Sequence, residues 1–234
     1  MQFFSYLING ISLGSVYALI ALGYTMVYGI AKMLNFAHGD VIMIGSYVVY
    51  FAFGASGLNP VLSIVLSMIV CTILGVVIER LAYRPLREAP SLAVLITAIG
   101  VSYLLQQVAQ LSWSSNPKSF TSVVSGMKPV SLFGGQLTIS AETIVTIVAC
   151  VVIMVVLMWF VNYTPAGHAM LAVSEDRGAA QLMGVNVNGT ISLTFAIGSA
   201  LAAIAGALLC SSYPTLQPTT GAMPGIKAFV AAVF

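Results

Sequence analysis

Charged residues are scarce in this chain: of 234 residues, 8 are Lys or Arg, 6 are Asp or Glu and 2 are His. The formal net charge of +2 is too small to indicate a nucleic-acid partner. Hydrophobic residues make up 59% of the sequence, and uncharged stretches of membrane-spanning length recur along it. Because about 20 apolar residues span the hydrocarbon core, the composition predicts an integral membrane protein in a lipid bilayer, with helical spans.

Common catalytic and nucleotide-binding motifs are also missing. The sequence contains no GxxxxGK[ST] phosphate loop, no HExxH zinc helix and no GxGxxG turn. We therefore predict that the chain is no enzyme, has no catalytic residues, and binds neither a metal nor a cofactor of its own. The three cysteines, Cys71, Cys150 and Cys210, fall within apolar runs without metal-ligand spacing, so we interpret them as buried thiols.

One short match to a protease motif is present. Residues 54–57, GASG, have the GxSG form that rhomboid-type intramembrane serine proteases place at the start of a helix. Here the motif is followed by Leu-Asn-Pro, which is typical of a turn, and the two histidines, His38 and His168, lie far from Ser56 in the sequence. An intramembrane serine protease is therefore an unfavoured alternative.

About seven apolar runs predict an all-α polytopic helical bundle, in a single transmembrane domain over residues 1–234. The runs cover residues 3–30, 41–53, 61–78, 91–111, 141–161, 191–211 and a stretch that begins near 226. The last run stops at Phe234 without a polar flank, so we expect that the natural protein continues, with eight runs when complete. Two runs carry small residues at every fourth position, typical of close helix packing: Gly10, Gly14 and Ala18 in the first, and Gly198, Ala202 and Gly206 in the sixth.

The positive residues set the expected orientation. Three arginines fall in the short segment of residues 80–87, which we place on the cytoplasmic side. Two further crossings then put Arg177 on the cytoplasmic side and put Lys118 and Lys128 outside. These two lysines belong to the polar segment of residues 112–140, which is expected to be an external loop containing a short hairpin.

The polar stretch NFAHGD, residues 35–40, interrupts the first apolar region and predicts a broken or re-entrant helix, with a cytoplasmic turn as the alternative. A helix that began at Asp40 or Val41 within the bilayer would direct free N–H groups and a positive dipole end toward a substrate path. Purely structural alternatives are Asp40 as an N-cap, Gly39 as a turn residue, Asn35 as a helix end and His38 as an interfacial imidazole. The candidate path residues are Asn35, Phe36, His38, Gly39, Asp40 and Met43.

Residues 164–189 form a moderately polar segment that is too charged to cross the membrane. It is predicted to be a cytoplasmic loop of helical character within the domain. Met170, Val173, Ala180 and Met183 can line one face of it, and a partner protein would cover that face. The alternative is an interfacial helix that packs on its own bundle.

Two stretches carry a family resemblance that runs along essentially the whole chain. Residues 14–47, GSVYALIALGYTMVYGIAKMLNFAHGDVIMIGSY, are similar to the amino-terminal signature of permease subunits of bacterial high-affinity ABC importers for branched-chain amino acids. Residues 167–187, GHAMLAVSEDRGAAQLMGVNV, resemble the ATPase-coupling loop of these permeases. The second stretch keeps AAxxxG at Ala179, Ala180 and Gly184, but has Gly178 where importers in general carry the glutamate of the EAA motif.

This resemblance implies a multi-pass permease of the bacterial inner membrane that moves Leu, Ile or Val from periplasm to cytoplasm by alternating access. It implies a heterodimer with a second homologous permease, two ATP-binding subunits that use ATP and Mg, and a periplasmic substrate-binding protein. A permease for urea or short amides is an alternative within the same superfamily, and a stand-alone channel or secondary carrier is an alternative of another class. The implied ATPase-coupling residues are Gly167, Glu175, Asp176, Arg177, Ala179, Ala180 and Gly184.

Overall fold

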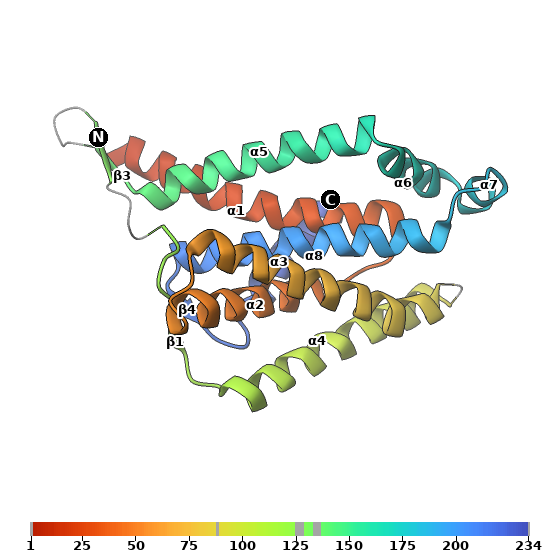
Figure 1. The fold of residues 1–234 in the computed structure, drawn as a ribbon, viewed down its shortest axis with the longest axis horizontal. Helices are drawn as coiled ribbons and strands as arrows, with labels where there is room; N and C mark the ends of the chain where they lie inside the picture. Colours follow the sequence, from red (N-terminus) through yellow and green to blue (C-terminus); the bar gives the residue numbers. More distant parts are fainter. Residues whose placement is uncertain (1, 88, 125–128, 133–136, 234) are drawn as a thin grey trace.

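The structure, a computed structural model, describes residues 2–87, 89–124, 129–132 and 137–233. Long helices that run roughly side by side dominate this part of the chain (Figure 1). Five of them are long and apolar enough to cross a membrane, which confirms the predicted polytopic helical fold class. They are α1 (Gln2–Ala31), α3 (Pro60–Ile78), α4 (Ser91–Trp113), α5 (Ala141–Tyr163) and α8 (Val187–Ser212).

Two shorter apolar helices occupy the remaining predicted runs. They are α2 (His38–Val49), which continues as the π-helical turn η1 (Tyr50–Ala55), and α9 (Ala222–Val233). The helix α3 likewise continues through η2 (Glu79–Tyr83) and η3 (Arg84–Leu86). Each of the seven predicted runs is therefore helical, but the count of seven membrane-crossing runs is not confirmed, since neither α2 nor α9 is among the five helices long and apolar enough to cross.

Short strands close one end of the bundle. β1 (Lys118–Ser119) pairs antiparallel with β4 (Thr215–Leu216), and β2 (Val130–Leu132) pairs antiparallel with β3 (Leu137–Ile139). The second pair is the hairpin predicted within residues 112–140. Lys128 lies outside the described residues.

The helix α8 lies at the centre and packs against α1, α2 and α3. Its small residues make this possible: Gly198, Ala202 and Gly206 are all buried. A Cβ atom at Gly206 would lie 2.5 Å from the Ile42 carbonyl oxygen, and one at Gly198 would lie 3.0 Å from the Gly23 carbonyl oxygen. The predicted small-residue stripe of the sixth run is thus a packing face, because backbones approach there more closely than larger side chains permit.

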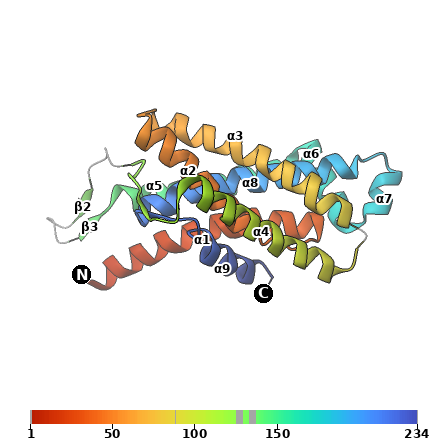
Figure 2. The same ribbon diagram turned by 90° about the horizontal axis from the view of Figure 1, so that it is seen from below.

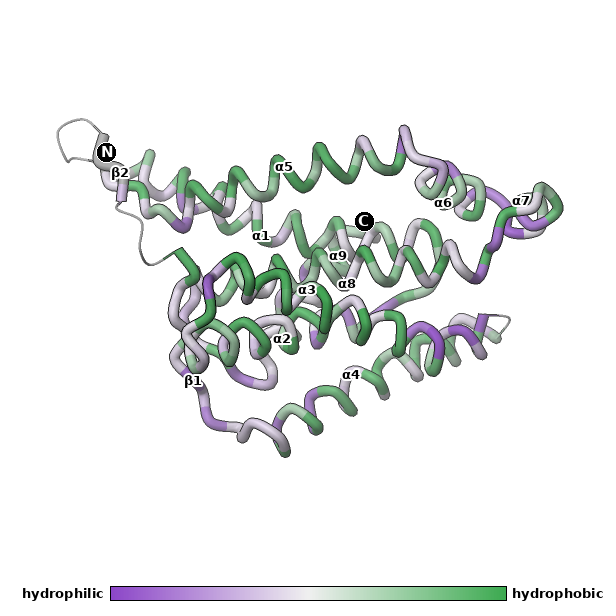
Figure 3. Tube along the Cα trace, viewed as in Figure 1, coloured by the Kyte–Doolittle hydropathy of each residue, from purple (hydrophilic) through white to green (hydrophobic). Residues whose placement is uncertain are grey.

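The outer helices α3, α4 and α5 present apolar side chains away from the bundle, and hydrophobic residues run along most of their length (Figure 3). Ile69, Leu104 and Val152 are each more than half exposed. Such surfaces are unfavourable in water and are typical of helices surrounded by lipid.

The two ends of the bundle carry different elements. The segment of residues 80–87 and the short helices α6 (Pro165–Glu175) and α7 (Arg177–Leu182) lie at one end, whereas the N-terminus, β1 and β4 lie at the other (Figures 1 and 2). Arg177 and the Arg-rich segment are therefore on the same side, opposite to Lys118, as the charge distribution predicts. We refer to the first end as the cytoplasmic end, following that prediction.

Candidate functional site

The chain turns back into the bundle after α1. The Asn35 backbone N–H donates to the Tyr24 hydroxyl, 3.2 Å away, and the Tyr83 hydroxyl donates to Asn35 Oδ1 at 3.0 Å. Tyr24 lies seven residues before the end of α1, about 10 Å along its axis at 1.5 Å per residue. The polar stretch of residues 35–40 is consequently a re-entrant break inside the bundle and not a turn beyond the helix ends.

The helix α2 begins at His38, two residues earlier than predicted, and Ala37 occupies its N-cap position without a side-chain hydrogen bond. Asp40 therefore belongs to the first turn of the helix. Its carboxylate accepts a hydrogen bond from Gln106 Nε2 of α4 at 2.9 Å. The interpretation of Asp40 as an N-cap is wrong, because the helix starts before it and the side chain joins α2 to α4.

Gly39 makes the closest contact of this region. A Cβ atom at Gly39 would lie 2.5 Å from the Gly221 carbonyl oxygen, and one at Gly225 would lie 2.9 Å from the Gly39 Cα atom. Gly39 is thus a buried residue of α2, and its interpretation as a turn residue is wrong. Since Gly221 immediately precedes α9, the amino-terminal ends of α2 and α9 meet inside the bundle.

His38 is fully buried, with 1% of its surface exposed, so it is not an interfacial imidazole. Its ring meets Tyr24 edge-on at 6.0 Å between centroids and lies against Gly23 of α1. Its Nε2 atom has no hydrogen-bond partner among the described residues. A buried imidazole nitrogen without a partner is costly, which makes it a candidate for a polar ligand.

The six predicted path residues gather around the beginnings of α2 and α9. Phe36 packs against Phe229 of α9 at 5.0 Å between ring centroids, and Met43 is fully buried one turn into α2. Phe36 is half-buried and the other five residues are buried, so the bundle covers them in this conformation. Their role in a substrate path stays a prediction.

The predicted coupling loop folds into α6 and α7. Thr164 caps α6: its hydroxyl accepts from the Gly167 N–H at 3.0 Å and donates to the Phe160 carbonyl at 2.7 Å. A Cβ atom at Gly167 would overlap the carbonyl oxygens of Phe160 and Val161. The sharp corner between α5 and α6 therefore requires a glycine at position 167, and this corner sets the direction in which the loop leaves α5.

The helix α7 is closed at both ends by local hydrogen bonds. Asp176 Oδ1 accepts from the N–H groups of Gly178 and Ala179, at 2.7 and 3.0 Å, which makes Asp176 the N-cap. At the other end Gly184 has φ of +85°, and its N–H donates to the Gln181 carbonyl at 3.0 Å. The AAxxxG pattern thus corresponds to a short helix that ends at a glycine in the left-handed conformation.

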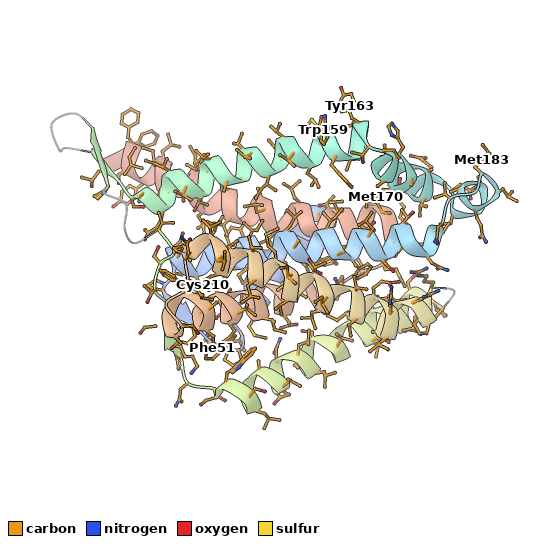
Figure 4. The ribbon with its side chains drawn as sticks, viewed as in Figure 1. Phe51, Trp159, Tyr163, Met170, Met183 and Cys210 are labelled. Carbon is orange, nitrogen blue, oxygen red and sulfur yellow. The ribbon has the colours of Figure 1, made fainter. Side chains whose placement is uncertain are left out.

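The apolar residues of this loop do not share one face. Met170, Val173 and Ala180 are buried against the protein's own bundle, whereas Met183 is 84% exposed and the adjacent Leu182 is 90% exposed. Figure 4 shows Met170 facing the bundle and Met183 at the outer tip. The single predicted face is wrong for Met183, because the chain changes direction at Asp176. One face of α6 packs on the protein's own bundle, and the most exposed apolar side chains of the loop lie at the tip of α7.

Charged side chains tie the loop to the bundle. Arg177 Nη2 donates to the Ala31 carbonyl at the end of α1, and Arg87 forms an ion pair with the buried Glu79 and donates to Asn188 Oδ1. Ser192 of α8 also donates to Glu79, at 2.6 Å. Sequence reasoning missed this network; its only signal was one acidic residue at the start of an Arg-rich segment.

The protease alternative has no support in the geometry. Ser56 is exposed and follows η1, whereas His38 begins the same helical segment 18 residues earlier, about 27 Å away at 1.5 Å per residue. His168 lies in α6 at the opposite end of the bundle. A serine nucleophile needs a base within hydrogen-bonding reach, and neither histidine provides one.

A bundle of membrane-length helices, with a re-entrant break and a compact helical loop at one end, defines a polytopic membrane transport protein. Residues 6–234 match the sequence family described as the permease component of the branched-chain amino acid transport system. The chain belongs to this family.

Relatives of the chain carry matching names. The high-affinity branched-chain amino acid transport system permease protein BraD of Pseudomonas aeruginosa is 44% identical over 97% of this chain and 77% of its own length. The corresponding protein LivH of Escherichia coli is 41% identical over 100% of this chain and 79% of its own length. More distantly, the ribose import permease RbsC of Haemophilus influenzae is 27% identical over 94% of this chain and 65% of its own length. No solved structure matches the fold significantly.

Proposed function

We propose that this chain is the permease subunit of an ATP-driven importer that moves Leu, Ile and Val from periplasm to cytoplasm across the bacterial inner membrane. The observation that carries the proposal is the identity of 41 to 44%, over nearly the whole chain, to BraD and LivH, whose names state this substrate class. The zwitterionic head and apolar side chain of these amino acids suit the break region, where buried apolar side chains lie beside His38, whose Nε2 has no hydrogen-bond partner in the described part of the chain.

In this proposal two ATP-binding subunits bind at the cytoplasmic end, hydrolyse ATP with Mg, and act on α6 and α7. The exposed Leu182 and Met183 supply the apolar contact. Asp176 and Gly184 fix the length and ends of α7, Gly167 fixes its direction, and Arg177 transmits its movement to α1. Glu175, Ala179 and Ala180 complete the coupling element.

The proposed substrate path follows the contact between α2 and α9. When these helices separate, the positive dipole ends of α2 and α9 and His38 Nε2 become accessible to the polar head of an amino acid. Asn35, Gly39 and Asp40 lie beside that opening, and Phe36 and Met43 offer apolar contact. Alternating access then consists of opening this contact to one side of the membrane at a time.

A second, homologous permease completes the path as a heterodimer, and a periplasmic binding protein delivers substrate at the opposite end from α7. One face of α1 suits a neighbouring permease: Gly10, Gly14 and Ala18 are all exposed. No described residue lies within 4 Å of a Cβ atom built at Gly10 or Gly14. Small residues in such a position permit a second helix to approach closely.

The direct test is transport by the complete complex in proteoliposomes, with binding protein outside and ATP trapped inside. Labelled Leu, Ile and Val are expected to accumulate only with ATP, and excess urea or acetamide is expected not to compete. Competition by urea would instead support the amide alternative. Uptake that is independent of ATP and of the other subunits would support a channel or secondary carrier and contradict the proposal.

A further inference from the structure

A second polar site lies at the cytoplasmic end between α1, α4 and α7, and none of the six proposed path residues lines it. A cavity of about 450 Å³ is lined there by a basic group and by small and apolar side chains. We call it the basic pocket; the residues that matter for the argument are Lys32, Leu34, Arg87, Ser91, Val94 and Arg177.

Positive charge in the basic pocket is only partly compensated by the described residues. Lys32, Arg87 and Arg177 supply three cations, and Glu79, the acid paired with Arg87, is fully buried and also accepts from Ser192. Burial and the proximity of Arg87 lower the pKa of the Arg177 guanidinium. Like charges held together in this way repel, and a bound anion would relieve the repulsion.

Hydrogen-bond donors in the basic pocket also lack acceptors. Arg87 Nε is buried and has no partner among the described residues. The helix α4 begins here at Ser91, and its N-cap residue, Pro90, makes no side-chain capping bond. Ser91, the first residue of this 23-residue helix, lines the cavity, so the positive dipole end of α4 lies beside the three cations. Three cationic side chains beside the positive end of a helix together suit the charge of a phosphate.

The level of the basic pocket and its apolar lining point to the source of that phosphate. It lies where α1 ends and the membrane-spanning α4 begins, which is the level of lipid headgroups. Leu34 and Val94 add apolar wall beside the cations. A protein carboxylate would require only the charges, whereas a lipid uses both the charges and the apolar wall.

We propose that the basic pocket binds the phosphate headgroup of an anionic phospholipid of the cytoplasmic leaflet, seated between α1 and α4 and held by Lys32, Arg87 and Arg177. The lipid would join the coupling helix α7 to two membrane-spanning helices. The site is separate from the substrate path and does not depend on which substrate is carried.

The test measures lipid binding to the purified complete complex in a neutral detergent. Phosphatidylglycerol and phosphatidylcholine with identical acyl chains are titrated and counted by native mass spectrometry. We expect phosphatidylglycerol to bind more tightly, and Lys32→Gln to weaken it about fivefold without changing phosphatidylcholine binding. Lys118→Gln, which removes one positive charge at the opposite end, is the matched control and is expected to change neither.

Other outcomes distinguish a lipid headgroup from a soluble anion or a protein contact, and some of them would contradict the proposal. Inorganic phosphate at millimolar concentration is expected to compete weakly; phosphate binding without any phosphatidylglycerol preference would assign the pocket to a soluble anion and overturn the lipid proposal. Phosphatidylglycerol that binds only when the ATP-binding subunits are absent would identify a protein contact instead. Equal binding of the two lipids, or equal weakening by Lys118→Gln, would also overturn it.

Discussion

Two stripes of small residues have the same spacing in the sequence but opposite surroundings in the structure. On α8, Gly198, Ala202 and Gly206 are buried against neighbouring backbones. On α1, Gly10, Gly14 and Ala18 are exposed. A four-residue repeat therefore predicts that a helix can be approached closely, but the identity of the approaching element depends on the rest of the fold and on the assembly.

The buried stripe predicts the largest loss of stability. Gly206→Leu would force a side chain into space occupied by the Ile42 carbonyl and the Ser46 hydroxyl, and overpacking of this kind costs about 3 kcal/mol. We expect the purified subunit to aggregate or to melt at a clearly lower temperature in size-exclusion and thermal-unfolding experiments. Gly100→Leu, on an exposed position of α4 with open space, is the matched control and should be tolerated.

The contact between the amino-terminal ends of α2 and α9 predicts the next largest loss of stability. Gly39→Ala places a Cβ atom 2.5 Å from the Gly221 carbonyl oxygen, so α2 and α9 must separate, at a cost of about 2 kcal/mol. Thermal unfolding should show the loss of stability, and a cysteine introduced near Gly221 should react faster with a thiol reagent than in the wild-type background. Unchanged melting and unchanged accessibility would mean that this contact is not closed in the native protein.

Replacement of Gly184, whose backbone has a positive φ angle, is expected to cause a smaller loss of stability. Gly184 has φ of +85° with open space around it, so Gly184→Ala strains the backbone by about 1 kcal/mol without a clash. We expect a small decrease in melting temperature and reduced co-purification of the ATP-binding subunits, because the end of α7 shifts. Gly178→Ala, in the same helix without a positive φ, serves as the control; an equal effect of both substitutions would contradict the proposed helix stop.

The exposed stripe predicts almost no change in the stability of the subunit alone. Gly14 is exposed, and a Cβ atom built there meets no described atom within 4 Å beyond the adjacent residues and the local helix backbone, so thermal unfolding of the isolated Gly14→Leu subunit should match that of the wild type. Co-purification of the second permease should decrease if that subunit packs here. Normal assembly of this variant would remove the stripe from the proposed heterodimer interface.

The sequence predicted the fold to the extent that hydrophobicity determines it. All seven apolar runs are helical, and the Arg-rich segment and Arg177 share one end of the bundle. The predicted start of α2 lies after the observed one, because Asp40 resembles a capping residue in the sequence. In the structure its carboxylate instead accepts a hydrogen bond from Gln106, 66 positions away. Long-range partners of this kind leave no periodic signal.

The candidate sites were predictable in location but not in geometry. The helices are interrupted between α1 and α2, as predicted near residues 35–40. The sequence of this segment, however, does not indicate that Gly221 and Gly225 pack against Gly39. In the coupling loop the apolar periodicity suggested a single face, but the cap at Asp176 divides the loop into two helices, and Leu182 and Met183 are its most exposed apolar side chains.

The central claim is that the exposed tip of α7 connects ATP hydrolysis to transport, and it is tested most directly by ATP-dependent leucine uptake of the double variant Leu182→Ser, Met183→Ser. Both side chains are exposed, so the subunit should fold normally, while uptake in proteoliposomes should fall at least about tenfold, as expected when a buried apolar contact of about 1.4 kcal/mol or more is lost. Tyr163→Ser, which replaces a 74% exposed side chain at the end of α5, should transport like the wild type. Full ATP-dependent uptake by the double variant would contradict the claim.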